Sequence, residues 1–204
     1  MSEQPRRFLN RRTITCEGYV REDGLLDIEG CLIDVRGKDS TNPWRGTVPA
    51  GGPVHQMRVC LTVDESLTIR ALEEATEAAP YPPCRNAAAA MQRLVGLRIV
   101  RGFRQEVRRR VGGPDSCTHV LSLLDSMASA AVQTLGSLRL GIEPGSALAA
   151  IATRDPARPT LIDSCVSYAA TSPIVAVLWP AEHRRKTGDA TSAAISGENS
   201  GTPS

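Results

Sequence analysis

The chain has 204 residues, of which 41% are hydrophobic and 23% charged, and its formal net charge is +2. These values are typical of a globular protein with a hydrophobic core, and they exclude a wholly disordered chain. So small a net charge does not indicate a nucleic-acid-binding protein, and we interpret the basic stretch at residues 101–110 as the solvated face of a short helix.

Residues 1–12 are polar and basic, and we expect them to be flexible. They lack the apolar segment of a signal peptide, and no stretch of the chain approaches the ~18 uninterrupted apolar residues of a membrane helix. We therefore expect a cytoplasmic protein without membrane contact. In that reducing compartment the six cysteines are expected to be free thiols or metal ligands.

Apolar and polar residues alternate in two pairs of segments near the N-terminus. Residues 13–20 and 25–35 are joined by Asp23-Gly24, a dipeptide typical of tight hairpin turns. Residues 57–63 and 67–77 form the second pair, although helix-forming residues dominate the end of the latter segment. The sequence therefore predicts two antiparallel hairpins.

The stretch between the predicted hairpins, residues 37–53, is rich in glycine and proline and predicts a long loop. After the second hairpin the periodicity changes to that of helices. We predict helices at 85–95, at 102–111 and at 117–136, with Gly136 ending the last of these.

Two more apolar segments, residues 161–168 and 174–179, predict short strands or a final hairpin. Residues 186–204 have the composition of a disordered tail. The sequence thus predicts one α+β domain at residues 13–183, in which two N-terminal antiparallel hairpins pack against a helical half.

Cys84 and Cys117 are each expected to stand where a helix begins, because each follows a run of proline or glycine. A helix N-terminus carries partial positive charge, which favours the thiolate, the form that binds metals. His55 is expected at the mouth of the second hairpin, close to the same end of the sheet. We therefore predict that His55, Cys84 and Cys117 bind zinc or iron and leave a fourth position open, with His119 nearby as a candidate fourth ligand.

The spacing of these residues does not by itself distinguish this hypothesis from simpler ones. No C-x-x-C pair is present, so the cysteines could equally be small core residues and the histidines surface residues. Cys117 could also be a metal-free nucleophile that attacks acyl thioesters. Asp27 and Glu29 lie on the same face of their strand, and such an acidic pair is usually solvated. For an enzyme, we predict that Asp27 and His119 transfer protons.

Several segments together resemble a bacterial domain-of-unknown-function family, number 2889. The segments that carry the resemblance are residues 16–30, 48–57, 79–84, 112–120 and 162–165. The resemblance runs over roughly residues 10–183, and Gln56 departs from it where an acidic residue is common. It implies an association with the catabolism of aromatic compounds, including lignin-derived dimers that lose formaldehyde.

Residues 53–135 also resemble, in the order of their elements, iron–sulfur cluster scaffold proteins. In that pattern His55, Cys84 and Cys117 fall at metal-ligating positions, whereas Pro53 stands where the scaffold has its leading cysteine. The resemblance therefore implies a scaffold-like core with a mononuclear metal site.

From these observations we expect a metal-dependent lyase or hydrolase that acts on a small-molecule aromatic catabolite. A non-catalytic metal- or cluster-binding protein is the further alternative. The sequence is compatible with a homo-oligomer, and it assigns no role to Cys165 or His183.

Overall fold

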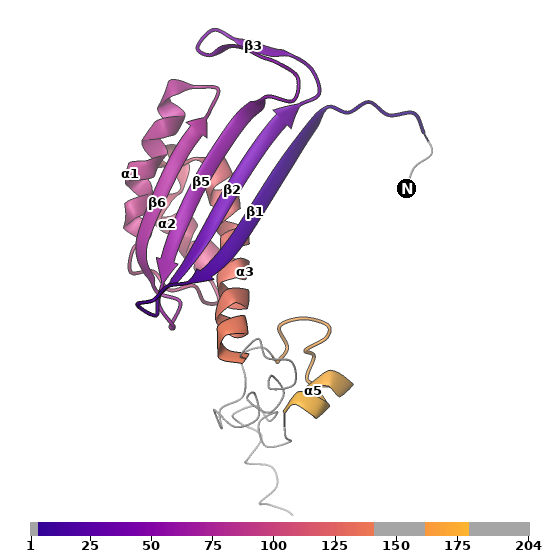
Figure 1. Ribbon diagram of the computed structural model, residues 1–204, viewed down its shortest axis with the longest axis vertical. Helices are drawn as coiled ribbons and strands as arrows, with labels where there is room; N and C mark the ends of the chain where they lie inside the picture. The colour runs from indigo at the N-terminus through magenta and orange to yellow at the C-terminus, as the bar shows by residue number, and fades with distance from the viewer. Residues whose placement is uncertain (1–3, 141–161, 180–204) are drawn as a thin grey trace, which may run out of the picture. The chain divides into compact units, whose positions relative to one another are not determined.

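A computed structural model describes residues 4–140 and 162–179 of the chain. Contacts along the chain separate two units, Met1–Arg139 and Leu140–Ser204. The first unit has α+β architecture, as predicted, with a four-stranded antiparallel sheet and helices that cover one of its faces (Figure 1).

The sheet contains the two predicted hairpins. Its strands are β1 (Asn10–Val20), β2 (Leu26–Arg36), β5 (Pro53–Val63) and β6 (Ile69–Ala78), in the order β1-β2-β5-β6. Every neighbouring pair is antiparallel. The segment after residue 67, which could have been a helix, is therefore a strand.

Local turn chemistry explains the two hairpins. In the first, the Arg21 N–H donates to the Leu25 carbonyl at 2.9 Å, and Gly24 adopts a φ of 82° that suits glycine. In the second, one carboxylate oxygen of Asp64 accepts hydrogen bonds from the backbone N–H groups of Ser66 and Thr68, at 2.8 and 3.0 Å. These bonds close each turn and fix the register of the strands that it joins.

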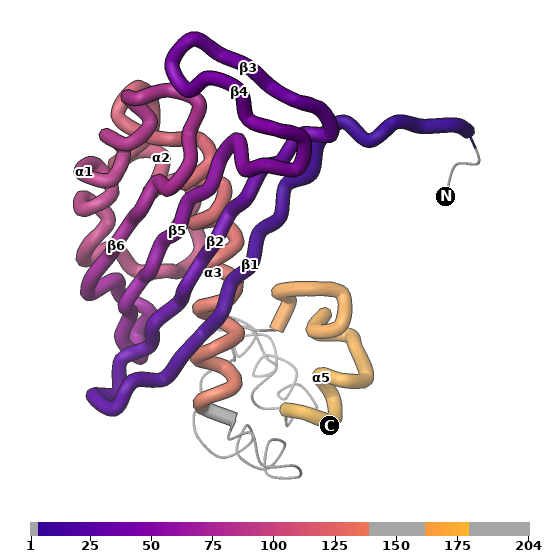
Figure 2. Tube along the Cα trace, turned by 45° about the horizontal axis from the view of Figure 1, so that its top comes forward, coloured from indigo at the N-terminus to yellow at the C-terminus, as the bar shows by residue number. Residues whose placement is uncertain are grey.

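The segment predicted as a long loop contains a small hairpin of its own. It is formed by β3 (Ser40–Asn42) and β4 (Gly46–Val48), and it lies beyond the end of the main sheet (Figure 2). The Asn42 side chain accepts hydrogen bonds from the N–H groups of Trp44 and Arg45, which closes its turn.

The helices follow the sheet in sequence, close to the predicted ranges. They are the 3₁₀ helix η1 (Pro82–Asn86), α1 (Ala87–Met91), η2 (Gln92–Leu94), α2 (Phe103–Val111), η3 (Gly113–Asp115) and α3 (Thr118–Leu140). Gly136 does not end α3, which continues for four more residues to Leu140. Cys84 lies inside η1 and not at the first residue of an α-helix.

The core lies between the sheet and these helices. Even-numbered residues of β2 point toward the helices, and Leu26, Ile28 and Leu32 are fully buried there. They pack with apolar residues of β5 and with one face of α3, namely Met57, Leu61, Val120, Leu123, Leu124 and Met127. We call this side of the sheet the covered face.

Two glycines allow α3 to lie close against the sheet. A Cβ atom at Gly18 would come within 1.8 Å of the Thr134 hydroxyl oxygen, and one at Gly30 within 2.5 Å of the Met127 sulfur. Any larger residue at either position would have to push the helix or these side chains away.

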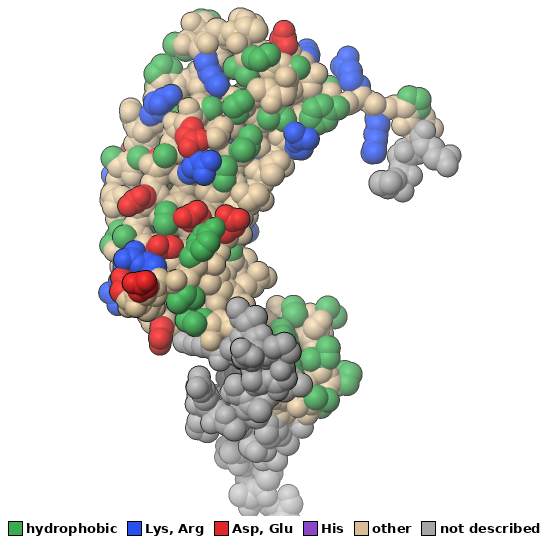
Figure 3. Space-filling view, in the orientation of Figure 1, with side chains coloured by type: hydrophobic (Ala, Val, Ile, Leu, Met, Phe, Trp, Pro, Cys, Tyr) green, Lys and Arg blue, Asp and Glu red, His purple; other side chains and the backbone are tan. Residues whose placement is uncertain are grey.

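The opposite side of the sheet, which we call the open face, carries polar residues and cysteines. Acidic and basic side chains are interspersed across it, with no histidine in view among the described residues (Figure 3). Asp27, Glu29, Cys31, Arg58 and Cys60 belong to this face, because they alternate with the buried residues of their strands.

The described part of the second unit covers residues 162–179. Its helix α5 (Pro173–Leu178) begins after Ser172, whose hydroxyl accepts a hydrogen bond from the Ile174 N–H. Residues 162–168 form turns, so the strands predicted in this region are wrong. An N-cap serine followed by proline favours a helix over a strand here.

Within residues 4–140 and 162–179, no helix combines the length and the apolar character needed to cross a membrane.

Candidate metal centre

One end of the covered face brings polar residues of three adjacent strands into a row. In the register of the sheet, Arg12 of β1 lies opposite Asp34 of β2, and Asp34 lies opposite His55 of β5. All three positions continue the buried side of their strands. Their side chains therefore point toward the helices, just beyond the apolar core.

The first turn of α3 completes the site. Its first α-helical hydrogen bond runs from the Leu121 N–H to the Cys117 carbonyl, at 3.0 Å, so Cys117 is the residue at the N-cap position. His119 lies in the following turn, and Cys117 is only 8% exposed. The close approach of α3 to the sheet thus brings His119 to Asp34 and His55.

Asp34 is the centre of this group. Its Oδ2 atom lies 3.1 Å from His55 Nδ1 and 3.5 Å from His119 Nε2. The two imidazole rings stack on each other, with ring centres 3.8 Å apart and planes inclined by 27°. One ligand atom from each of the three residues lies within 4.8 Å of the other two.

Arg12 holds the carboxylate from the other side. Its Nε and Nη2 atoms each donate to one oxygen of Asp34, both at 2.8 Å, which is a bidentate pair. These bonds lower the pKa of Asp34 below its ordinary value, and they outweigh the effect of partial burial, which acts in the opposite direction. Asp34 is therefore ionised and fixed in orientation.

Both imidazoles are biased toward their neutral forms. Burial lowers the pKa of His55, and so does the neighbouring His119, although Asp34 partly opposes them. Burial and the positive charge of Arg12 also lower the pKa of His119. A neutral imidazole has a free nitrogen lone pair, which is the form that binds a metal ion.

The two separations that Asp34 Oδ2 makes with the histidine nitrogens suit a single ion. With metal–nitrogen and metal–oxygen bonds of about 2.0–2.2 Å, neighbouring ligand atoms in tetrahedral or octahedral sites lie about 3.0–3.5 Å apart. The two measured contacts of Asp34 Oδ2, at 3.1 and 3.5 Å, match this range. Two histidines and one carboxylate form a donor set that suits zinc or iron(II).

Cys117 contacts the same site through His119. Its sulfur lies 3.6 Å from His119 Nδ1, the ring nitrogen that faces away from Asp34. His119 can therefore offer Nε2 to a metal ion while Nδ1 interacts with the thiol, an arrangement in which a second partner orients a ligand.

Comparison with protein-family models gives one match, to a family described as "Protein of unknown function (DUF2889)", over residues 10–133. The chain belongs to this family. The matched residues include every member of the cluster around Asp34 and exclude the second unit. Neither the curated proteins nor the solved structures contain a match to this DUF2889 chain, so the likeness to iron–sulfur scaffolds stays a prediction.

The residues predicted as metal ligands are not all in one place in this DUF2889 domain. His55 belongs to the cluster, His119 is central to it, and Cys117 contacts it through His119. Cys84 is not part of the cluster; it lies in η1, where its N–H donates to the Tyr81 carbonyl.

Asp27, predicted to move protons, lies on the open face, opposite to the side on which Asp34 lies. Its carboxylate accepts a hydrogen bond of 2.7 Å from the Thr62 hydroxyl, and it lies 3.7 Å from an Arg21 nitrogen. The geometry thus places Asp27 away from His119 and gives it a local structural partner.

Sequence reasoning missed Asp34 and Arg12 as members of the site. The signal was present in the first hairpin, because a turn at residues 21–25 places Arg12 opposite Asp34. A basic and an acidic residue in register at a strand end, next to a histidine on the following strand, would have indicated this cluster.

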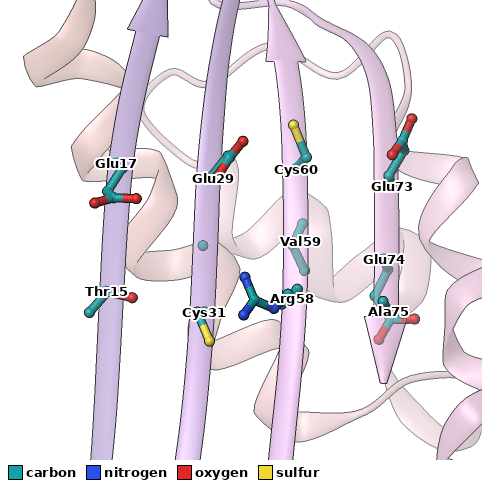
Figure 4. Close-up of a pocket in the computed structure, with 11 residues that line it drawn as sticks. Thr15, Glu17, Glu29, Cys31, Arg58, Val59, Cys60, Glu73, Glu74 and Ala75 are labelled. Carbon is teal, nitrogen blue, oxygen red and sulfur yellow. The ribbon is translucent and has the colours of Figure 1, made fainter. Parts of the chain in front are cut away.

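A second group of ionisable residues lies on the open face and differs in arrangement. Glu17, Glu29, Cys60 and Glu73 lie opposite one another in a single row across all four strands (Figure 4). They line an open trough of about 490 Å³. These side chains stand one strand apart and do not converge on a point, so they form a solvated surface.

Proposed function

We propose that this protein binds a zinc or iron ion through Asp34, His55 and His119. The observation that supports the proposal is the convergence of three partly buried ligand atoms within 4.8 Å of one another. Their protonation also fits, since the pKa of each is shifted toward the form that coordinates a metal.

The surroundings of the three ligands favour catalysis over a purely structural role. Three protein ligands leave coordination positions open, whereas structural zinc sites usually have four. A metal ion held in this way supplies a Lewis acid that polarises a substrate oxygen. Beside it, His119 and Cys117 form a pair that can hold or pass a proton between Nδ1 and the sulfur.

The reaction class that we propose is that of a lyase or hydrolase acting on a small aromatic catabolite in the cytoplasm. The class follows from the family resemblance, and the open coordination positions are compatible with it. A metal- or cluster-binding protein without catalytic activity would have the same ligands, and it would bind metal without turning over any such compound.

Elemental analysis of protein purified without a chelator tests the metal site. We expect about one zinc or iron per chain in the wild type, and almost none in His55→Ala or His119→Ala, because two remaining ligands bind a divalent ion weakly. Asp34→Asn should also lose most of the metal, since the amide removes the negative charge.

Cys84→Ala is the matched control, because Cys84 lies outside the cluster. It should retain the metal content of the wild type. Metal-free wild-type protein that also fails to take up added zinc or iron(II) would contradict the proposal. Loss of metal in both Cys84→Ala and His55→Ala, with Asp34→Asn still loaded, would favour the ligand set predicted from the sequence, which is His55, Cys84 and Cys117.

A second candidate function has its own observation in support. Cys117, His119 and Asp34 lie in a chain of contacts, in which the sulfur is 3.6 Å from one ring nitrogen and the carboxylate is 3.5 Å from the other. Thiol nucleophile, base and orienting acid follow this order in cysteine enzymes. A metal-free hydrolase acting on acyl thioesters is therefore the alternative.

Hydrolysis of a simple acyl thioester in the presence of a chelator distinguishes the two candidates. If the protein is a metal-dependent enzyme, we expect no hydrolysis when the chelator is present. If the protein is a thiol enzyme, hydrolysis should continue with the chelator present, and Cys117→Ala should abolish it. His55→Ala should leave it in place, because among the described residues His55 contacts His119 and not Cys117.

A further inference from the structure

Strand β1 forms one edge of the sheet and has a partner on one side only. It pairs with β2, and within the described residues no strand pairs with its other side. An edge of 11 residues with no proline is long for an unprotected strand. Its free backbone groups are a template for pairing with another chain.

The hydrogen bonds to β2 show which groups of β1 are free. The Gly37 N–H donates to the Leu9 carbonyl, and the Arg21 N–H donates to the Leu25 carbonyl, so odd-numbered residues face β2. In an antiparallel ladder the intervening residues direct both backbone groups to the other side. The residues with outward groups are therefore Asn10, Arg12, Ile14, Cys16, Gly18 and Val20.

Exposed apolar side chains gather at the two ends of this edge. Phe8 and Leu9, just before β1, are 54% and 58% exposed, and Tyr19 and Val20, at its end, are 47% and 55% exposed. Between these ends, Arg11 and Glu17 have opposite charges and both lie on the open face, whereas Arg12 pairs with Asp34 on the covered face. Among the described residues Arg11 makes no ion pair, and the side-chain hydrogen bond that Glu17 accepts there comes from the Tyr19 hydroxyl.

We propose that a second copy of this chain pairs with this edge, β1 against β1, antiparallel about a twofold axis at Ile14. In this register Arg11 lies opposite Glu17 of the partner subunit, twice by symmetry, so each unpaired charge meets its opposite. Leu9 lies opposite Tyr19 of the partner subunit, and Phe8 opposite Val20 of the partner subunit.

The other pairs in this register are compatible with it. Asn10 lies opposite Gly18 of the partner subunit, Arg12 opposite Cys16 of the partner subunit, and Thr13 opposite Thr15 of the partner subunit; none of these joins like charges. Each outward backbone group also meets an outward group, because even-numbered residues pair with even-numbered residues. The two sheets would become one continuous sheet.

Neighbouring registers fit less well. A shift of one residue places outward groups opposite inward ones, so the ladder cannot form. A shift of two residues places Arg11 opposite Tyr19 or Thr15 of the partner subunit and separates the apolar pairs. Charge and apolar contacts therefore favour the axis at Ile14.

Charge-reversal variants test the dimer. The measurement is the molar mass of the full chain in solution, by sedimentation or light scattering. The wild type is expected to be a dimer. Arg11→Glu and Glu17→Arg should each weaken dimerisation at least tenfold, because each places like charges opposite one another twice. The double variant, Arg11→Glu with Glu17→Arg, should restore the dimer.

Arg108→Glu is the matched control for Arg11→Glu, since Arg108 is an exposed arginine of α2 and its replacement changes the net charge by the same amount. It should leave the molar mass unchanged. A wild type that is monomeric at every concentration would overturn the proposal, and hydrogen exchange would then show whether another part of the chain protects the edge. A dimer that both single variants leave intact would overturn it as well.

Discussion

Ionisable side chains lie on both faces of the sheet, but their arrangements differ. On the covered face, ionisable side chains lie at one end and converge, so that Asp34 contacts Arg12, His55 and His119 at once. On the open face, Glu17, Glu29 and Glu73 stand in a row with the spacing of the strands. Convergence in a partly buried place therefore distinguishes the candidate site from the open-face row.

Cysteines on the two sides of the sheet also have different neighbours. Cys117, on the covered side, contacts an imidazole at 3.6 Å. Cys60, on the open face, lies near carboxylates, and burial together with Asp27, Glu29 and Glu73 raises its pKa to about 11. Cys117, at the start of α3, therefore has a neighbour that can take its proton, whereas Cys60 has neighbours that disfavour its thiolate.

The largest difference between the faces should appear in stability. Leu61 of β5 is fully buried on the covered face, and Leu61→Ala should lower the free energy of unfolding by about 2–5 kcal/mol, because it leaves a cavity. Arg58→Ala, on the open face of the same strand, should change it by no more than about 0.5 kcal/mol. Urea denaturation measures both, and equal losses would mean that the open face is also packed.

A smaller difference should appear in the reactivity of Cys60. Its pKa of about 11, compared with an ordinary value of 9.0, reduces the thiolate fraction near neutral pH by about 100-fold. Cys60 should therefore react with iodoacetamide about that much more slowly than a free thiol. Glu29→Gln combined with Glu73→Gln should accelerate the reaction, and an unchanged rate would mean that burial alone controls it.

A further difference concerns arginines that pair with carboxylates. Arg12→Ala should lower the affinity for zinc about 10- to 100-fold, because Arg12 keeps Asp34 ionised and oriented. Arg58→Ala, which removes the pair with Glu77 on the open face, is the control and should have no effect. Titration with zinc measures both, and tighter binding by Arg12→Ala would show that Arg12 competes with the metal.

The smallest expected effect is on stability against pH in metal-free protein. His55 and His119 have lower pKa values in the folded state than the ordinary 6.5, so the unfolded chain binds more protons. Their contribution is present above pH about 6.5 and is lost as pH falls through the lowered folded-state values. Removing both, as His55→Gln with His119→Gln, should flatten this decline in denaturation experiments.

An increase in the free energy of unfolding as the pH falls from 7 to 5 would contradict this expectation. It would mean that Asp34 stabilises the charged imidazoles in the folded protein.

Much of the fold could be predicted because its signals are local. Alternation and the turns at Asp23-Gly24 and at Asp64 determine the four strands, and the periodicity of residues 117–136 indicates α3. The prediction for the C-terminal segment is wrong, because the short apolar run at 174–179 fits a helix or a strand, and only the preceding Ser172-Pro173 indicates a helix start.

The site could be predicted only in part, because it depends on distant contacts. The expectation that His55 and the start of α3 meet at one end of the sheet agrees with the geometry, since His55 and His119 stack there. Cys84 was predicted as a ligand because it follows a proline run. Such a run indicates where a helix starts, but not where the cysteine side chain points. Asp34 required the register of two strand pairs, which no single segment contains.

Gly18 and Gly30 have a consequence for the geometry of the candidate site at the other end of α3. Because neither has a side chain, the long helix rests directly on the strands, and its first turn reaches the strand ends at the right height. These two positions thus set the distance between α3 and the strands that carry the other proposed ligands. Gly30→Ala is therefore expected to weaken the binding of an ion at the proposed site, although residue 30 is not one of the proposed ligands.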